Sequence, residues 1–259
     1  MQTLRVLFAM WRASIESELE YRMNFVVTLL SSVLGLGFGV LGVGLFFDEG
    51  RAFEGWTYDE SLVVLGFFTF LTGYVGCLLS PNLSNLVGHV ESGSLDFVLL
   101  KPFDSQLHVS ARELSPWGLP DLALGFGLIV YGARASLPSV VDVALSIVAL
   151  ATALALVSAL WFLVASTAIW FVRIYNATEV LRGLLDVGRF PISAYPPLAR
   201  ALFTFGVPIA FMTTVPAEVL LGRAAPRSVI VALAFTIGAV WLSRIVWRRA
   251  LRSYTSASS

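Results

Sequence analysis

Residues 88–104 read Gly88-His-Val-Glu-Ser-Gly-Ser-Leu-Asp-Phe-Val-Leu-Leu-Lys-Pro-Phe-Asp104, the longest polar interruption in an otherwise mostly apolar chain. Within it, Leu95, Val98 and Leu99 recur at the spacing of one helical face. Pro102 ends the pattern, because proline cannot continue a helix. We therefore predict a short amphipathic helix over 91–103. A helix with one apolar face must lie on a membrane surface or dock into a partner protein.

The rest of the chain has the composition of a membrane protein. Of its 259 residues, 57% are hydrophobic and 13% are charged, and the mean hydropathy is +0.82. Several apolar runs approach the length of about 20 residues that crosses about 30 Å of hydrocarbon. We predict an all-α polytopic membrane protein with one transmembrane domain over 1–259. A net charge of zero gives nucleic-acid binding no support.

The apolar runs and the charges between them predict a topology. Residues 1–23 can place apolar side chains on one face of a helix and charged side chains on the other, which predicts an amphipathic helix in the membrane interface. The loop over 48–60 is rich in acids and has only one arginine, which places it outside, and the tail after the last apolar run carries arginines and no acid, which places it inside. Both termini are therefore expected in the cytoplasm, which requires an even number of crossings. The predicted spans lie at 24–47, 61–79, 114–131, 140–165, 166–188 and 229–247. Glycines over 35–44 predict close helix packing in the first span.

The position of the fifth span has two solutions. Hydropathy alone favours 198–221 and leaves the charged segment before it as a cytoplasmic helix. The alternative places the span at 166–188, so that the proline-broken residues 190–221 dip into the outer leaflet and leave again. Irregular backbone at that depth must be buried in protein or line a cavity.

Two motifs resemble the permease subunits of bacterial ATP-binding-cassette exporters of the second type, and the resemblance covers nearly the whole chain. They are Glu91-Ser-Gly-Ser-Leu-Asp96 with Lys101-Pro102, and Phe190-Pro-Ile-Ser-Ala-Tyr-Pro196 followed by Gly206-Val-Pro208 and Pro216. The resemblance implies that the 91–103 helix is a cytoplasmic coupling helix. It also implies that 190–221 is a re-entrant hairpin on the outer side, which favours the fifth span at 166–188.

The resemblance further implies a function and its residues. Such permeases form half of an export path in the inner membrane, beside a second identical or related permease, and two cytoplasmic ATPases drive them. The residues expected to couple to the ATPase are Glu91, Gly93, Leu95, Asp96, Val98, Leu99, Lys101, Pro102 and Phe103. The re-entrant hairpin would contain Pro191, Pro196, Pro208, Pro216 and Glu218.

Charged residues interrupt the apolar character after residue 172. Glu179–Arg182 and Arg182–Asp186 have the spacings of ion pairs along one helix face, and Arg189 follows. Charges at membrane depth require partners, since an unpaired one costs at least about 2.5 kcal/mol. These four residues therefore predict a polar wall of the translocation path or of the subunit interface. The competing interpretation is a solvated surface helix.

Several kinds of chemistry find no support in the sequence. Lys101 is the only lysine and does not lie in a G-x-x-x-x-G-K-[ST] loop, so ATP and Mg²⁺ are expected on a partner subunit and not on this chain. The histidines lack an array of metal ligands, and no nucleophile–base constellation is visible, so neither a metal site nor an enzyme is predicted. The alternative function is a secondary transporter or channel that works without an ATPase.

Overall fold

Long helices packed side by side form the body of the protein. The computed structural model describes residues 10–17, 22–48, 53–83, 86–100, 104–170 and 177–254. Within these ranges, the helical segments long and apolar enough to cross a membrane are Met23–Asp48, Tyr58–Leu83, Val140–Ile169 and Pro226–Ser253. The all-helical membrane class is confirmed. By length and composition the described helices account for 4 crossings, or 5 with a bent helix pair, and not for the predicted six.

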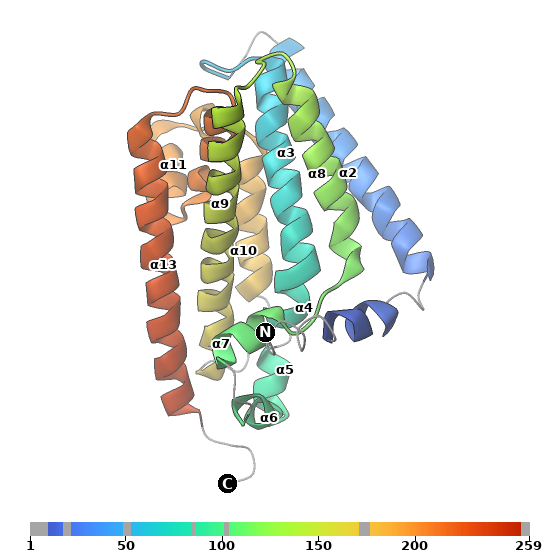
Figure 1. Ribbon diagram of the computed structural model, residues 1–259, viewed down its shortest axis with the longest axis vertical. Helices are drawn as coiled ribbons and strands as arrows, with labels where there is room; N and C mark the ends of the chain where they lie inside the picture. The colour runs from blue at the N-terminus through green and yellow to red at the C-terminus, as the bar shows by residue number, and fades with distance from the viewer. Residues whose placement is uncertain are drawn as a thin grey trace.

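The helices divide into a body and two ends. The body contains α2 (Arg22–Asp48), α3 (Tyr58–Tyr74), α8 (Leu119–Ala133), α9 (Val140–Ser166), α10 (Ala177–Leu185) and α13 (Pro226–Ser253). Short helices are α4 (Ser80–Leu83), α5 (Leu86–Glu91), α6 (Leu95–Leu99), α7 (Ser105–Ala111), α11 (Pro197–Ala201) and α12 (Thr214–Leu220). In Figure 1, α4 to α7 gather at the lower end of the body and α11 lies near the upper end.

Local sequence signals explain where the body helices begin. Capping boxes start α3 at Thr57, with Glu60, and α9 at Ser139, with Asp142, and in each the two residues exchange backbone and side-chain hydrogen bonds. The third body helix, α8, begins only at Leu119, after a 3-10 turn, and not at residue 114 as predicted. Prolines 116 and 120 explain the delay, because proline fits only the first turn of an α-helix.

Helices α3 and α8 approach each other so closely that their backbones touch. A Cβ atom added to Gly118 would lie 2.2 Å from the carbonyl oxygen of Gly73, and one added to Gly125 would lie 2.4 Å from the backbone nitrogen of Phe70. A third glycine seven residues further along α8, Gly132, meets α3 in the same way. No side chain fits at these contacts, so the glycines set the distance between the two helices.

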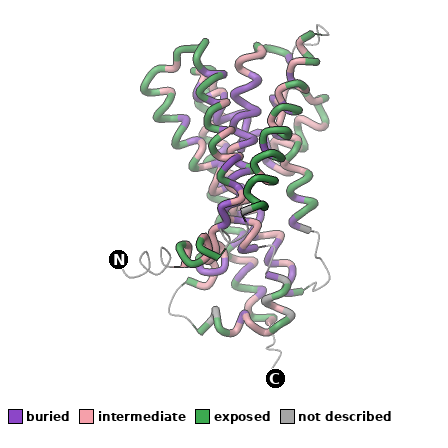
Figure 2. The backbone as a smooth tube through the Cα atoms, turned by 90° about the vertical axis from the view of Figure 1, so that its right-hand side faces the viewer, coloured by how far each residue is buried: buried purple, intermediate pink, exposed green. Residues whose placement is uncertain are grey.

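The predicted close packing of the first span is only partly correct. A Cβ atom on Gly39 would meet the Leu65 side chain at 3.1 Å, but Gly35 and Gly37 face open space within this chain. Only 11% of the most apolar window of α2 is buried, against 72% for α3. Figure 2 shows the buried residues concentrated along the middle of the bundle. Glycine content alone does not say which helix face has a neighbour, and most of α2 has none here.

The amphipathic N-terminal segment is helical where the structure describes it. Residues 10–17 form a helix that lies across the lower end of the body in Figure 1. The indole N–H of Trp11 donates to the Ala111 carbonyl at 2.8 Å, and the Ser14 hydroxyl donates to the Leu114 carbonyl at 3.1 Å. Of the predicted range 1–23, residues 1–9 and 18–21 lie outside the described residues, and the last two belong to α2.

Neither predicted position of the fifth span matches a continuous helix. The boundary at 165/166 is wrong, because α9 continues to Ser166 and into the 3-10 turn Thr167–Ile169. Residues 171–176 lie outside the described residues, and α10 then packs against α9. The other placement, over 198–221, coincides with two helices, Pro197–Gly206 and Ile209–Leu220, that are bent by 71° against each other, so it is either a broken span or a re-entrant segment. Pro208 lies in that break and supplies no N–H to continue the first helix.

Candidate functional site: a polar cleft and a protrusion at the lower end

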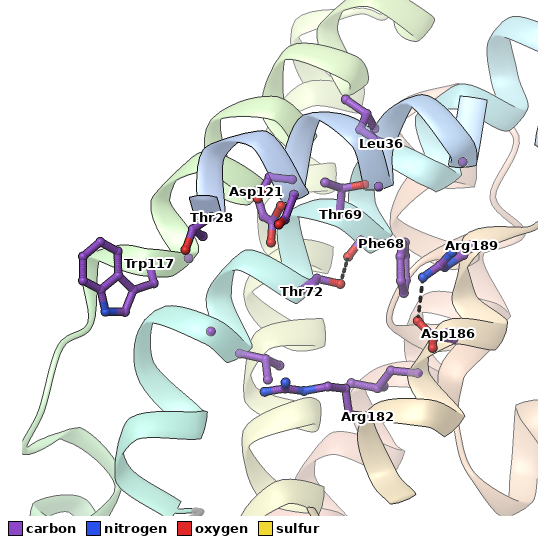
Figure 3. A pocket seen from close by; sticks show the side chains of 18 of the residues that line it. Thr28, Leu36, Phe68, Thr69, Thr72, Trp117, Asp121, Arg182, Asp186 and Arg189 are labelled. Carbon is purple, nitrogen blue, oxygen red and sulfur yellow. Dashed lines mark hydrogen bonds and ion pairs between the residues drawn. The ribbon is translucent and has the colours of Figure 1, made fainter. Parts of the chain in front are cut away.

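A cleft of about 550 Å³ opens in the side of the body, between α2, α3, α8 and the segment around α10. We call it the polar cleft, because charged side chains line two of its walls. Asp121 comes from α8, and Arg182, Asp186 and Arg189 come from α10 and the 3-10 turn after it (Figure 3). Helices α2 and α3 add hydroxyl groups, from Thr28, Ser31, Ser32, Thr69 and Thr72.

The four charged residues predicted from the sequence form ion pairs that differ in part from those that their spacing predicts. Arg182 lies 3.8 Å from Glu179, as expected, and it also donates to the Ser80 hydroxyl at 2.5 Å. Asp186 pairs with Arg189 at 3.0 Å, and not with Arg182. The reason is that α10 ends at Leu185 and continues as a 3-10 turn, in which side chains three residues apart are aligned.

Three of these four residues line the polar cleft, and Glu179 lies outside its lining. The guanidinium of Arg189 also lies 5.1 Å from the centre of the Phe68 ring, a cation–π contact with α3. Arg182, Asp186 and Arg189 therefore face the cleft, while the role of these charges as a polar wall of the translocation path stays a prediction.

The hydroxyl groups of α2 were not predicted as site residues. Thr28, Ser31, Ser32, Gly35 and Gly39 line the cleft at helical spacing. These residues recur at helical spacing in the sequence, but the span is so apolar overall that they do not stand out. The carboxylate of Asp121 was likewise not included among the site residues, although it stands within an apolar run.

The predicted 91–103 helix is two short helices in the structure. Gly93 has a φ of +69°, a left-handed conformation that ends α5, and α6 starts at Leu95. We call residues 86–100 the protrusion, because Figure 1 shows α5 and α6 extending below the body. The side chains of Glu91, Val98 and Leu99, and all of Lys101, Pro102 and Phe103, lie outside the described residues.

Leu95 does not face outward, although it is among the residues expected to couple to the ATPase. Its exposed fraction is 0%, and it belongs to the same buried cluster as Leu86 and Trp247. Among the described side chains of the protrusion, the large apolar ones that are exposed are Phe97, at 71%, and Leu100, at 80%. The coupling role of the segment stays a prediction.

Polar contacts tie the chain after the protrusion to the lower part of α13. Arg244 forms an ion pair with Asp104, which also caps α7 by accepting from the Leu107 N–H. Two further hydrogen bonds run from Trp247 to the Ser105 hydroxyl at 3.0 Å and from Gln106 to the Ser243 hydroxyl at 3.2 Å. At the end of α13, Tyr254 lies near Asp96 of α6, and burial and this carboxylate raise the pKa of Tyr254.

The ion pair of Asp104 predicts a dependence of stability on pH. Burial acts to raise the pKa of Asp104, but hydrogen bonds from Leu107 and Arg244 and the charge of Arg244 outweigh it, so the pKa lies below its ordinary value. The contribution of this ion pair to the free energy of unfolding is therefore present above the ordinary pKa of about 3.9, and it is lost as the pH falls through the lowered pKa. Both side chains are partly exposed, so we expect about 1 kcal/mol or less. The difference in unfolding midpoint between the wild type and Asp104→Asn should shrink below about pH 4; a difference that does not change with pH contradicts this.

The proline-rich region between α10 and α13 is held to the body by specific hydrogen bonds. The Tyr195 hydroxyl donates to the Val187 carbonyl at 2.8 Å, and the Ile192 N–H donates to the Thr214 hydroxyl at 3.2 Å. Pro191 and Pro196 precede short helical turns, and Pro216 lies in the first turn of α12, where its carbonyl accepts from Ser146 of α9. The backbone carbonyl of Glu218 accepts from Arg223 in the turn before α13.

Arg223 connects this turn to the start of α3. It donates to Glu60 at 2.7 Å and to the Gly55 carbonyl, and its guanidinium lies 4.7 Å from the centre of the Trp56 ring. Glu60 is also the acid of the capping box of α3, so one carboxylate serves both contacts. The region that contains the bent helix pair is therefore anchored at its far end.

The comparison with protein families agrees with this architecture. The family model described as ABC-2 family transporter protein matches residues 33–258, which include the protrusion, the bent helix pair and most of the lining of the polar cleft. A search of the curated proteins finds no match. The match covers well over half of the chain. Members of this family act in transport rather than in catalysis, and this is the role of the chain. The protein therefore belongs to the ABC-2 transporter family, as a non-catalytic, multi-pass membrane permease subunit.

Proposed function

We propose that the protein is the permease subunit of an ATP-driven exporter in a bacterial inner membrane. It would form half of the translocation path beside a second identical or related permease. A cytoplasmic ATPase subunit would bind ATP and Mg²⁺ and drive transport. The observation that carries the proposal is the protrusion, which presents Phe97 and Leu100 to the surroundings of this chain while Leu95 anchors it to the body.

A six-crossing topology supports this role. In Figure 1, α2, α8 and α10 run toward the upper end, and α3, α9 and α13 run toward the lower end. The 15 residues of α8 rise about 22 Å as an α-helix, so the 3-10 turn before it and the loop after it would complete the crossing. The arginines near the end of α13 favour the lower end as the cytoplasmic side. Both termini would then lie in the cytoplasm.

On this topology the bent helix pair is a re-entrant hairpin in the outer leaflet. Both of its halves lie between α10 and α13. A hydrogen bond from Ser146 of α9 to the Pro216 carbonyl holds the second half, and Tyr195, just before the first half, donates to the turn after α10. Backbone that leaves helical geometry at membrane depth must be covered by protein. The second half, Ile209–Leu220, is mostly buried in the body, while no residue of Pro197–Gly206 is buried within this chain.

The exposed face of α2 supports pairing with a second permease. Gly35, on the side of the cleft, leaves the backbone of this face uncovered within this chain, and small residues let membrane helices approach closely. Helix α2 is also one wall of the polar cleft, so a second permease at this face would bring two clefts together between the subunits.

The experiment is co-purification of the tagged permease, in mild detergent, from cells that carry its neighbouring genes. The wild type should retain a protein with a G-x-x-x-x-G-K-[ST] loop at one-to-one stoichiometry. The Phe97→Ser, Leu100→Ser double variant should lose about tenfold or more of it, as expected when an apolar anchor of an interface is removed.

Leu137→Ser is the matched control, because Leu137 is 84% exposed and lies in the turn between α8 and α9, at the other end of the body. It should retain the ATPase in full. If the control and the double variant retain the ATPase equally, or if the wild type purifies without any ATPase, the result argues against the proposal. It would then favour a transporter or channel that works without an ATPase.

A further inference from the structure

Asp121 differs from the other charges of the polar cleft in having no basic partner. Arg182 has Glu179, and Arg189 has Asp186. Asp121 is hydrogen-bonded to the Ser32 hydroxyl of α2, and among the described residues no arginine or histidine pairs with it. Two arginines and two aspartates make the described lining neutral as a whole, and Asp121 is the one of these four charged side chains without an ion-pair partner among the described residues.

The position of Asp121 keeps its carboxylate available. It stands in the first turn of α8, where the helix dipole favours a negative charge. In Figure 3 its side chain points into the cleft, while the arginines and Asp186 lie on the opposite side. The single hydroxyl of Ser32 uses only part of the capacity of two carboxylate oxygens to accept hydrogen bonds.

The surroundings of Asp121 suit an organic cation. Trp117, one turn earlier, lines the same cleft and is packed against Phe25 of α2, with the ring centres 6.4 Å apart. An indole face attracts ammonium groups, with most effect where water is excluded. Thr28 and Ser31 add hydroxyls on the α2 side, and Leu36 and Leu65 supply an apolar surface further along the cleft.

We propose that the polar cleft binds an amphiphilic organic cation, with its positive group at Asp121 and its apolar body along α2 and α3. The proposal deepens the proposed function, since it rests on the cleft being part of the translocation path, and it names the substrate class. An anionic ligand is disfavoured, because it would have to displace Asp186 from Arg189 or Glu179 from Arg182 while facing the Asp121 carboxylate.

The test uses two probes of nearly equal size and opposite charge, tetraphenylphosphonium and tetraphenylborate. Equilibrium dialysis of the purified full-length permease in a non-ionic detergent measures the binding of each. The wild type should prefer the cation. Asp121→Asn should weaken cation binding on the order of tenfold, the effect of losing one desolvated charge partner, and should leave anion binding unchanged or slightly stronger.

Two further variants separate recognition from damage to the fold. Asp121→Glu keeps the charge and should restore most of the cation binding. Asp142→Asn changes a carboxylate at the start of α9, outside the cleft, and should bind both probes like the wild type. Equal weakening of both probes by Asp121→Asn, or a wild type that prefers the anion or binds neither probe, would overturn the proposal.

The binding experiment does not depend on the ATPase subunit. Binding is measured without ATP and without a partner, so failure of the cation proposal leaves the docking of an ATPase at Phe97 and Leu100 untouched. Loss of ATPase co-purification would in turn leave a preference for cations in place.

Discussion

Gly125→Ala is expected to destabilise the protein by about 2 kcal/mol or more, while Gly127→Ala, two residues away on the same helix, stabilises it by up to about 1 kcal/mol. The added methyl group on Gly125 would lie 2.4 Å from the backbone nitrogen of Phe70 and 2.8 Å from the Gly66 carbonyl oxygen. Backbone atoms cannot turn aside as a side chain does, so α3 and α8 must separate. Gly127 has nothing within 4 Å, and only the higher helix propensity of alanine acts there.

The measurement is the free energy of unfolding of each purified variant in mixed micelles, titrated with a denaturing detergent. Gly125→Ala and Gly127→Ala make the same chemical change on one helix, so they affect the unfolded state alike. The difference between their free energies of unfolding therefore reports the contact with α3. Gly73→Ala should behave like Gly125→Ala, because its Cβ atom would lie 2.5 Å from the backbone nitrogen of Leu122. If Gly125→Ala and Gly127→Ala shift stability equally, the close approach of the two helices is incorrect.

Leu95→Asp is expected to unfold the protrusion, at a cost of about 3–5 kcal/mol, because a carboxylate at this fully buried position would have no compensating charge. Leu100→Asp, five residues further on, should change stability by about 0.5 kcal/mol or less, because the leucine is 80% exposed. Both leucines stand in the same segment that the sequence identifies as important, so the pair separates a folding role from a docking role.

Limited proteolysis of the purified protein reports the difference. Leu95→Asp should make residues 86–104 much more sensitive to cleavage, and Leu100→Asp should leave their sensitivity unchanged. Retention of the ATPase should be lost in both variants. Leu95→Asp with wild-type resistance to protease would show that the buried cluster does not depend on this residue.

Part of this architecture follows from the order of residues alone. Apolar runs longer than about 20 residues require membrane helices, because lipid offers backbone groups no hydrogen-bond partner. The helix over 24–47 was predicted within two residues of the observed Arg22–Asp48. The polar stretch after the second span, and the prolines that interrupt residues 190–221, also marked where regular helices end. These features are local, and local interactions decide them.

The tertiary structure decided which faces of these helices meet. Nothing within α2 reveals that Gly35 and Gly37 face open space, and nothing within α8 reveals that Gly125 and Gly132 meet α3, because each contact needs a second helix dozens of residues away. Leu95 and Leu100 have the same side chain, and only the packing of α6 against the lower end of the body separates an anchor from an exposed residue. Asp121 faces Arg182 and Arg189 across a cleft for the same reason: burial and pairing depend on positions in space, which spacing along one helix does not contain.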